Sequence, residues 1–144
     1  MATSKRNDPY GRFHFLLEID GVATAGFTEV SGLSTETSVI EYREGSDRSP
    51  TRKLPGITKY SNITLKRGIT KDRSLWQWRK TVMDGATQRK NGAVVLLDES
   101  RQEVARWNFH DAWPCKWEGS SLNAKSSEVA IETLELAHEG FELE

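Results

Sequence analysis

The sequence has few of the features that stabilise small secreted proteins or anchor a protein in a membrane. Cys115 is the only cysteine among 144 residues, so no disulfide can form within the chain. No apolar run approaches the roughly 20 residues that a membrane-spanning helix needs. The opening residues, MATSKRNDPYGR, contain no apolar signal segment. We therefore expect a protein that is made and folded in the cytoplasm, with no membrane binding by the subunit itself.

Residues suited to catalysis or metal binding are equally sparse. No two of the histidines have the i, i+4 spacing of helical metal ligands: His14, His110 and His138. A nucleophile pair of Cys115 and His110 is conceivable, but a structural cysteine is favoured, because tryptophans lie on both sides of it in the sequence. No glycine-rich phosphate-binding motif is present. We expect no enzyme activity, no metal and no cofactor.

The composition fits one folded domain over residues 1–144, since 28% charged and 36% hydrophobic residues are typical of globular proteins. The net charge is −1, yet residues 43–80 carry 11 basic and 3 acidic residues, whereas residues 118–144 carry 7 acidic and 1 basic. Two interpretations stay open. Either the two regions attract each other between copies of the chain, or they are solvated faces that pair within one copy.

Alternation of apolar and polar side chains predicts a mainly β protein. The clearest strand covers residues 12–19, and Asp20–Gly21 predicts a tight hairpin into a second strand over residues 22–30. Further strands are predicted over residues 35–43, 62–69, 93–97 and 103–111. Residues 127–138 are ambiguous, because their Glu, Ala and Leu content favours a helix while their alternation favours a strand.

One amphipathic helix is predicted to begin after a capping residue, Thr70 or Asp72, and to end at Gly85. Leu75 and Trp78 fall on one face of this helix, so we expect both to face the core. Together with aromatic and aliphatic residues of the strands they form the expected core set: Phe13, Phe15, Leu17, Leu75, Trp78, Trp107 and Phe109.

Residues 44–59 contain two prolines, two glycines and two serines and show no clear periodicity. Such a connection is long for a compact domain, and loops of this length are usually functional or disordered. We expect a long cationic loop here that contacts a neighbouring subunit, and a flexible N-terminal arm over residues 1–8. The candidate residues for contact between subunits are Arg48, Arg52, Lys53, Lys59, Lys66 and Arg67.

The same cations suggest an alternative function, a basic-patch nucleic-acid-binding β-domain. They could neutralise phosphates, and Tyr60 could stack on a base. The sequence pI of about 6.3 argues against this, because nucleic-acid-binding domains usually exceed about 9.

Three segments of the chain resemble one protein family. The central one, KLPGITKYSNITLKRGITKDRSLWQW at residues 53–78, resembles a signature of tail-tube proteins from contractile phage tails and phage-tail-like contractile injection systems. DPYGRFHFLLEIDGVATAGFTEVSGL at residues 8–33 resembles the opening strand pair of that family, and residues 107–143 resemble its closing segment. The resemblance covers nearly the whole chain and implies a long strand over the ambiguous residues 127–138.

This resemblance implies the tail-tube fold, which is also the haemolysin-coregulated-protein-like fold. That fold is a small β-barrel or β-sandwich with one flanking helix and a long extended loop. The resemblance also implies a structural role, in which six copies form a ring and stacked rings form a hollow tube. The tube is a conduit for effector cargo or phage DNA, driven into the target by sheath contraction.

The implied partners are other copies of the chain, a sheath protein, baseplate or spike proteins, tube-terminating proteins, and lumenal effector cargo or phage DNA. Assembly is expected in a bacterial cytoplasm. The place of action is expected to be a virion, or an extracellular or cell-anchored phage-tail-like particle.

Overall fold

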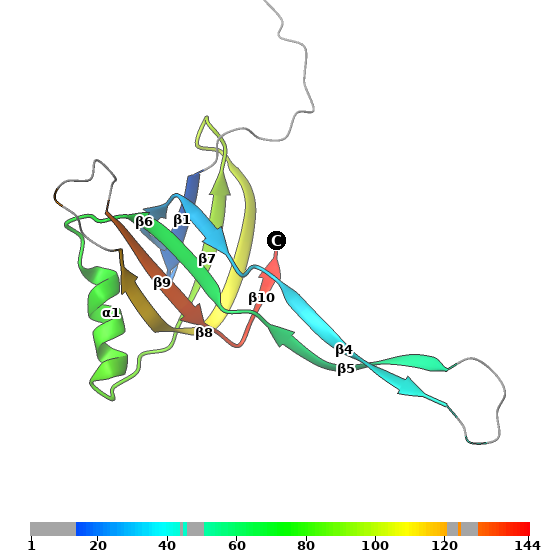
Figure 1. The fold of residues 1–144 in the computed structure, drawn as a ribbon. Coiled ribbons are helices and arrows are strands. Elements are labelled where there is room, and N and C mark those ends of the chain that lie inside the picture. The colour runs from blue at the N-terminus through cyan, green and yellow to red at the C-terminus, as the bar shows by residue number, and fades with distance from the viewer. Residues whose placement is uncertain (1–13, 44, 46–50, 121–123, 125–129) are drawn as a thin grey trace, which may run out of the picture.

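The computed structural model describes residues 14–43, 45, 51–120, 124 and 130–144. The expected arm over residues 1–8 and the expected core residue Phe13 lie outside the described residues. The described part contains, in chain order, β1 (His14–Ile19), β2 (Val22–Phe27), β3 (Glu29–Ser31), β4 (Thr35–Tyr42), β5 (Arg52–Tyr60), β6 (Ile63–Gly68), α1 (Ser74–Met83), β7 (Lys90–Leu97), β8 (Glu103–Gly119), β9 (Ile131–Ala137) and β10 (Gly140–Leu143). Figure 1 shows these elements as a curved body with one projecting hairpin.

The body is an antiparallel sheet in the order β2-β1-β7-β8-β9-β6-β3, and β10 pairs with β8 beside this path. The two end strands, β2 and β3, are separated in the chain by Thr28 alone. The backbone N–H of Thr28 donates to the carbonyl of Lys66 on β6 at 2.9 Å. The ends of the sheet therefore adjoin without being closed into a barrel. The mainly β fold class with one helix is confirmed.

The first hairpin forms as the sequence predicts. Asp20 and Gly21 have φ angles of 53° and 80°, and Ile19 pairs directly with Val22. Two consecutive residues with positive φ make the two-residue turn whose twist matches that of antiparallel strands.

The core lies between the curved sheet and α1. Four of the expected core residues are at most 5% exposed: Leu17, Leu75, Trp78 and Phe109. Phe15 and Trp107 are partly buried and pack against the same cluster. The indole Nε1 of Trp78 donates to the carbonyl of Gln88 at 2.8 Å. The predicted helix and its inward face are thus confirmed.

The N-cap of α1 is Arg73, which makes no side-chain capping hydrogen bond, and the expected capping residues Thr70 and Asp72 lie just before it. The Thr70 hydroxyl accepts a hydrogen bond from the backbone N–H of Asp72 at 3.2 Å. The Asp72 carboxylate in turn accepts one from the N–H of Ser74 at 2.9 Å. This second bond favours the charged carboxylate and lowers the pKa of Asp72. At the other end Gly85, with a φ of 79°, terminates the helix.

Two segments differ from the sequence prediction, and a third, which the residues alone left ambiguous, is decided. Residues 52–60, expected within a loop, form β5 and pair with β4. The predicted strand at residues 103–111 continues as β8 to Gly119, across a bend at Asp111, whose φ is 53°. The helical alternative for residues 127–138 is wrong over β9, because that strand is paired on both sides, with β6 and with β8.

Candidate functional site

The most distinctive surface of the structure is the hairpin of β4 and β5. It forms a two-stranded sheet of its own and projects away from the body (Figure 1). Every residue of β4 is exposed, and so is every residue of β5 except Gly56. An isolated two-stranded hairpin is only marginally stable in water.

The base of the hairpin is fixed to the body by polar and aromatic contacts. The hydroxyls of Ser34 and Ser61 lie 2.8 Å apart, and the Nε2 of His138 donates to the Ser61 carbonyl at 2.7 Å. The ring of Tyr60 meets that of Phe141 on β10 edge to face, with centroids 5.2 Å apart. These contacts set the direction in which the hairpin leaves the body.

The hairpin is irregular at its middle, opposite Pro55 and Gly56. The pairing register shifts between Thr37 and Val39, and the hydroxyl oxygen of Ser38 accepts a hydrogen bond from the N–H of Ile57 at 3.0 Å. A Cβ at Gly56 would lie 2.5 Å from that oxygen. The Pro-Gly pair therefore marks a bulged site inside the strand pair, where the sequence suggested a loop.

Large apolar side chains lie exposed along the hairpin. The exposed fraction is 61% for Val39, 52% for Ile40, 44% for Leu54 and 70% for Ile57. Tyr42 adds an aromatic ring that is 47% exposed. Contiguous apolar patches on a soluble protein mark interaction surfaces. Sequence reasoning missed this surface because it concentrated on the cations, although the β-branched residues of β4 carried the signal.

The cations expected to contact other subunits lie partly on the hairpin and partly on the body. Arg52, Lys53 and Lys59 lie exposed on β5, whereas Arg48 is outside the described residues. Lys53 stands opposite Glu41, and Lys59 stands opposite Glu36. The hairpin is therefore both apolar and charged. On the body, Lys66 is half-buried on β6 and lines a shallow depression.

Arg67 differs from the exposed cations, because its side chain is buried within its own subunit. It has the same strand parity as Ile63 and Leu65, and all three are buried. Its guanidinium forms an ion pair with Glu132 of β9 and lies 5.4 Å from the ring centroid of Phe27. At 5% exposure, Arg67 neutralises an acidic residue of its own subunit. Part of the attraction between the cationic middle and the acidic end is thus intramolecular.

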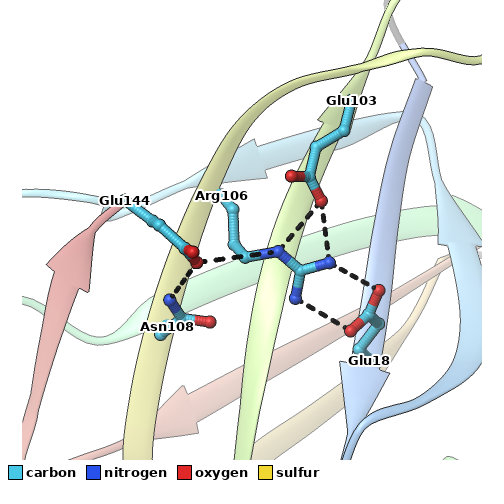
Figure 2. Close-up of polar contacts among 5 residues, drawn as sticks. All are labelled: Glu18, Glu103, Arg106, Asn108 and Glu144. Atoms are coloured by element: carbon cyan, nitrogen blue, oxygen red, sulfur yellow. Dashed lines mark hydrogen bonds and ion pairs between the residues drawn. The ribbon is translucent and has the colours of Figure 1, made fainter.

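A second polar surface surrounds Arg106 on the body (Figure 2). Its guanidinium binds both carboxylate oxygens of Glu18, at 2.9 and 3.0 Å, and contacts Glu103 at 2.7 Å. Hydrogen bonding to Glu18 is the main reason that the pKa of Arg106 is raised. Asn108 donates to Glu144 at 2.9 Å, so β1, β8 and the end of the described chain are tied together.

This surface, which we call the Arg106 face, is acidic overall. Arg106 is surrounded by more carboxylates than it can neutralise: Glu18, Asp20, Glu103, Glu142 and Glu144. It is opposite in sign to the cations exposed on β5.

The described residues offer little for catalysis. One group with metal-ligating atoms within 4.8 Å of one another consists of His110, Asp111 and Glu139. It lies at the surface, where His110 already contacts Asp111 at 3.2 Å. The Sγ of Cys115 lies 3.5 Å from the carbonyl of Glu135, and burial raises the pKa of this thiol. Within the described chain, no helix is both long and apolar enough to span a membrane.

Comparison with protein families decides between the two functions. The model of the T4-like virus tail tube protein gp19 family matches residues 11–142. The chain belongs to this family. It is a tail tube protein, and the nucleic-acid-binding alternative gains no support. Among proteins with curated descriptions, no significant match was found.

Several solved structures resemble this tail tube protein. A chain from the baseplate of the anti-feeding prophage is 26% identical, with a TM-score of 0.75 over 100% of this chain and 97% of that one. A chain from the PVC sheath–tube complex, an extracellular contractile injection system, is 24% identical, with a TM-score of 0.81 over 99% of both chains. Hcp1 from Flavobacterium johnsoniae shares the fold at 18% identity, with a TM-score of 0.56 over 90% of this chain and 94% of Hcp1.

Proposed function

We propose that this tail tube protein is the repeating subunit of a hollow tube, with six copies in each ring and rings stacked along one axis. The observation that carries the proposal is the projecting hairpin, which exposes large apolar side chains on a chain of this family. A hairpin that binds a different patch on another copy makes a heterologous contact. Repeated heterologous contacts build closed rings or open filaments.

Free strand edges support the same arrangement. Among the described residues, each strand of the hairpin has one pairing partner, and β10 pairs with β8 alone. Exposed edges carry unpaired N–H and C=O groups, and proteins cover them to avoid uncontrolled aggregation. Contacts between subunits in a ring would cover these edges in a defined way.

The exposed cations of the hairpin contribute to stacking. Arg52, Lys53 and Lys59, together with Arg48, contact an adjacent subunit or the next ring, and Lys66 adds a contact from the body. Each exposed ion pair contributes roughly 0–1 kcal/mol and is screened by salt. Because every subunit repeats the contact, the small contributions add around each ring.

The partners follow from the particles in which similar chains are found. Those are a six-fold symmetrised baseplate, a sheath–tube complex and a tube-terminating cap. We infer that this chain meets a sheath protein, baseplate or spike proteins, and a tube terminator. The tube is a conduit for effector cargo or phage DNA, is driven into the target by sheath contraction, and has no catalytic turnover.

The tube is assembled in a bacterial cytoplasm and acts in an extracellular or cell-anchored particle or in a virion, without membrane binding by the subunit itself.

Mass measurement and negative-stain microscopy of the purified protein over a concentration series test this function. The expected species are monomers, six-copy rings and stacked tubes, with no excess absorbance at 260 nm. A strictly monomeric protein at high micromolar concentration, which also fails to polymerise on a baseplate seed, would refute the proposal. A salt-sensitive complex with nucleic acid would instead favour the alternative.

A further inference from the structure

Three side chains with metal-ligating atoms meet where β8 bends. They are His110 and Asp111 of β8 and Glu139, which lies between β9 and β10. Their ligand atoms, one nitrogen and two carboxylate oxygens, all lie within 4.8 Å of one another. Histidine spacing in the sequence does not reveal this group, because the pairing of β10 with β8 brings together residues that are far apart in the chain.

Backbone contacts hold the two segments of this group in register. The N–H of Glu139 donates to the carbonyl of His110 at 3.1 Å, and Gly140 pairs with His110. A Cβ at Gly140 would lie 3.1 Å from Nε2 of the His110 ring, so a glycine here leaves room for that ring. The N–H of Asp111 donates to Oδ1 of Asn91 at 3.0 Å. The bend that carries His110 and Asp111 is therefore supported by β7.

The spacing of the donor atoms suits a small transition-metal ion. Bonds of about 2.1 Å at tetrahedral angles place two ligand atoms about 3.4 Å apart. Nδ1 of His110 and Oδ2 of Asp111 lie 3.2 Å apart. The Glu139 side chain is 58% exposed, and a shift of its carboxylate by about 1 Å completes the same spacing. An ion at this point replaces the contact between His110 and Asp111, and the imidazole then keeps its proton on Nε2.

We propose that His110, Asp111 and Glu139 bind a divalent transition-metal ion, with Zn²⁺ as the best fit. One imidazole and two carboxylates suit Zn²⁺, whereas Mg²⁺ and Ca²⁺ prefer oxygen ligands throughout. Water completes the coordination, because the group lies at the surface. The bound ion joins the bend of β8 to the start of β10 and stabilises the folded subunit by mass action. This role goes beyond the proposed function and does not depend on assembly.

A neighbouring cation competes with the metal ion for one ligand. Nη1 of Arg89 lies 3.5 Å from Oε1 of Glu139, and both side chains are more than half exposed. Exposed ion pairs of this kind contribute little to stability, so the metal ion can displace Arg89 at little cost. Arg89→Gln removes the competitor and should bind Zn²⁺ at least as tightly as the wild type.

Calorimetric titration of the purified full chain with ZnCl₂, in a buffer that does not chelate zinc, tests the proposal. We expect one ion per chain and a dissociation constant below about 100 μM. At about 1 mM Zn²⁺ the melting temperature should rise by about 3 °C or more. Mg²⁺ in about hundredfold excess should not displace the ion, because it does not favour an imidazole ligand.

Conservative variants of the three ligands give the second measurement. His110→Ala, Asp111→Asn and Glu139→Gln should each weaken Zn²⁺ binding by about tenfold or more. Asp111 has a φ of 53°, and asparagine tolerates positive φ better than most residues, so the bend is kept. The melting temperature of each variant without metal shows that the fold is intact. The rise produced by Zn²⁺ should shrink or disappear.

Matched controls change the same residue types elsewhere on the surface. His14→Ala removes an exposed imidazole from β1, and Glu118→Gln removes an exposed carboxylate from β8. Cys115→Ala removes the thiol, which is the other common zinc ligand of the chain. All three should bind Zn²⁺ like the wild type. The proposal is overturned if the wild type binds no Zn²⁺ at about 1 mM, if His110→Ala binds it normally, or if Cys115→Ala abolishes binding.

Discussion

Replacing Trp78 separates the stability of the subunit from its assembly. The indole is 5% exposed and belongs to the core cluster, and its Nε1 donates to the Gln88 carbonyl. Trp78→Ala should lower the free energy of unfolding by about 3–5 kcal/mol, since it leaves a large cavity. Trp78→Phe keeps most of the packing and loses the hydrogen bond, at a cost of about 1 kcal/mol, because Gln88 is exposed and its carbonyl can bind water.

Urea unfolding of the monomer, followed at concentrations too low for assembly, provides the assay. A loss of about 4 kcal/mol should lower the midpoint by about 2 M if the slope is about 2 kcal/mol per molar urea. Trp76→Ala is the control, because Trp76 is 38% exposed and mainly meets the ring of Trp117 at 4.9 Å. It should cost about 1 kcal/mol.

The reasoning fails if Trp78→Ala unfolds like the wild type yet cannot form rings. Trp78 would then act at an interface between subunits and would not stabilise the core.

Three further changes test other parts of the structure. Glu132→Gln should destabilise the subunit by about 3 kcal/mol, because it leaves Arg67 buried without its anionic partner. Adding Arg67→Met to this variant should restore part of the melting temperature. If the melting temperature is not restored, the buried ion pair is contradicted. Cys115→Ala should cost about 1 kcal/mol and leave assembly intact, so loss of particle function in normally assembled tubes would argue for a chemical role of the thiol. Arg52→Glu with Lys53→Glu should leave a folded subunit that forms short tubes or none, as seen by microscopy; wild-type tube length and salt resistance would show that these cations are only solvated.

The sequence predicts best those strands that bury one face, because burial imposes alternation. β1 and β6 are examples, with Leu17 and Leu65 directed into the core. The same rule would have placed Arg67 inside, since it shares the parity of Leu65. Its charge suggested a surface contact, yet a carboxylate from β9 was available to pair with it. That pairing joins residues far apart in the sequence and is invisible to local reasoning.

The sequence analysis did not predict the hairpin, because its strands are exposed and leave no burial pattern. β5 is exposed on both sides, so no burial pattern of period two marks it in the subunit, and Pro55–Gly56 imitates a loop. Proline is tolerated there because a free strand edge needs no N–H donor at that position. β9 shows a third case, in which pairing with β6 and β8 overrides the helix propensity of its Glu, Ala and Leu residues. The alternation of residues 127–138 left a strand and a helix open, and the family resemblance decided for the strand.

Cryo-electron microscopy of the wild-type assembly tests the central claim most directly. The map should show stacked rings of six copies, each hairpin leaving its own subunit at the Tyr60–Phe141 contact and ending buried against other copies. Val39, Ile40 and Ile57, now largely exposed, should be removed from solvent. A tube in which the hairpins point into solvent, or a preparation that contains only monomers, would contradict the account.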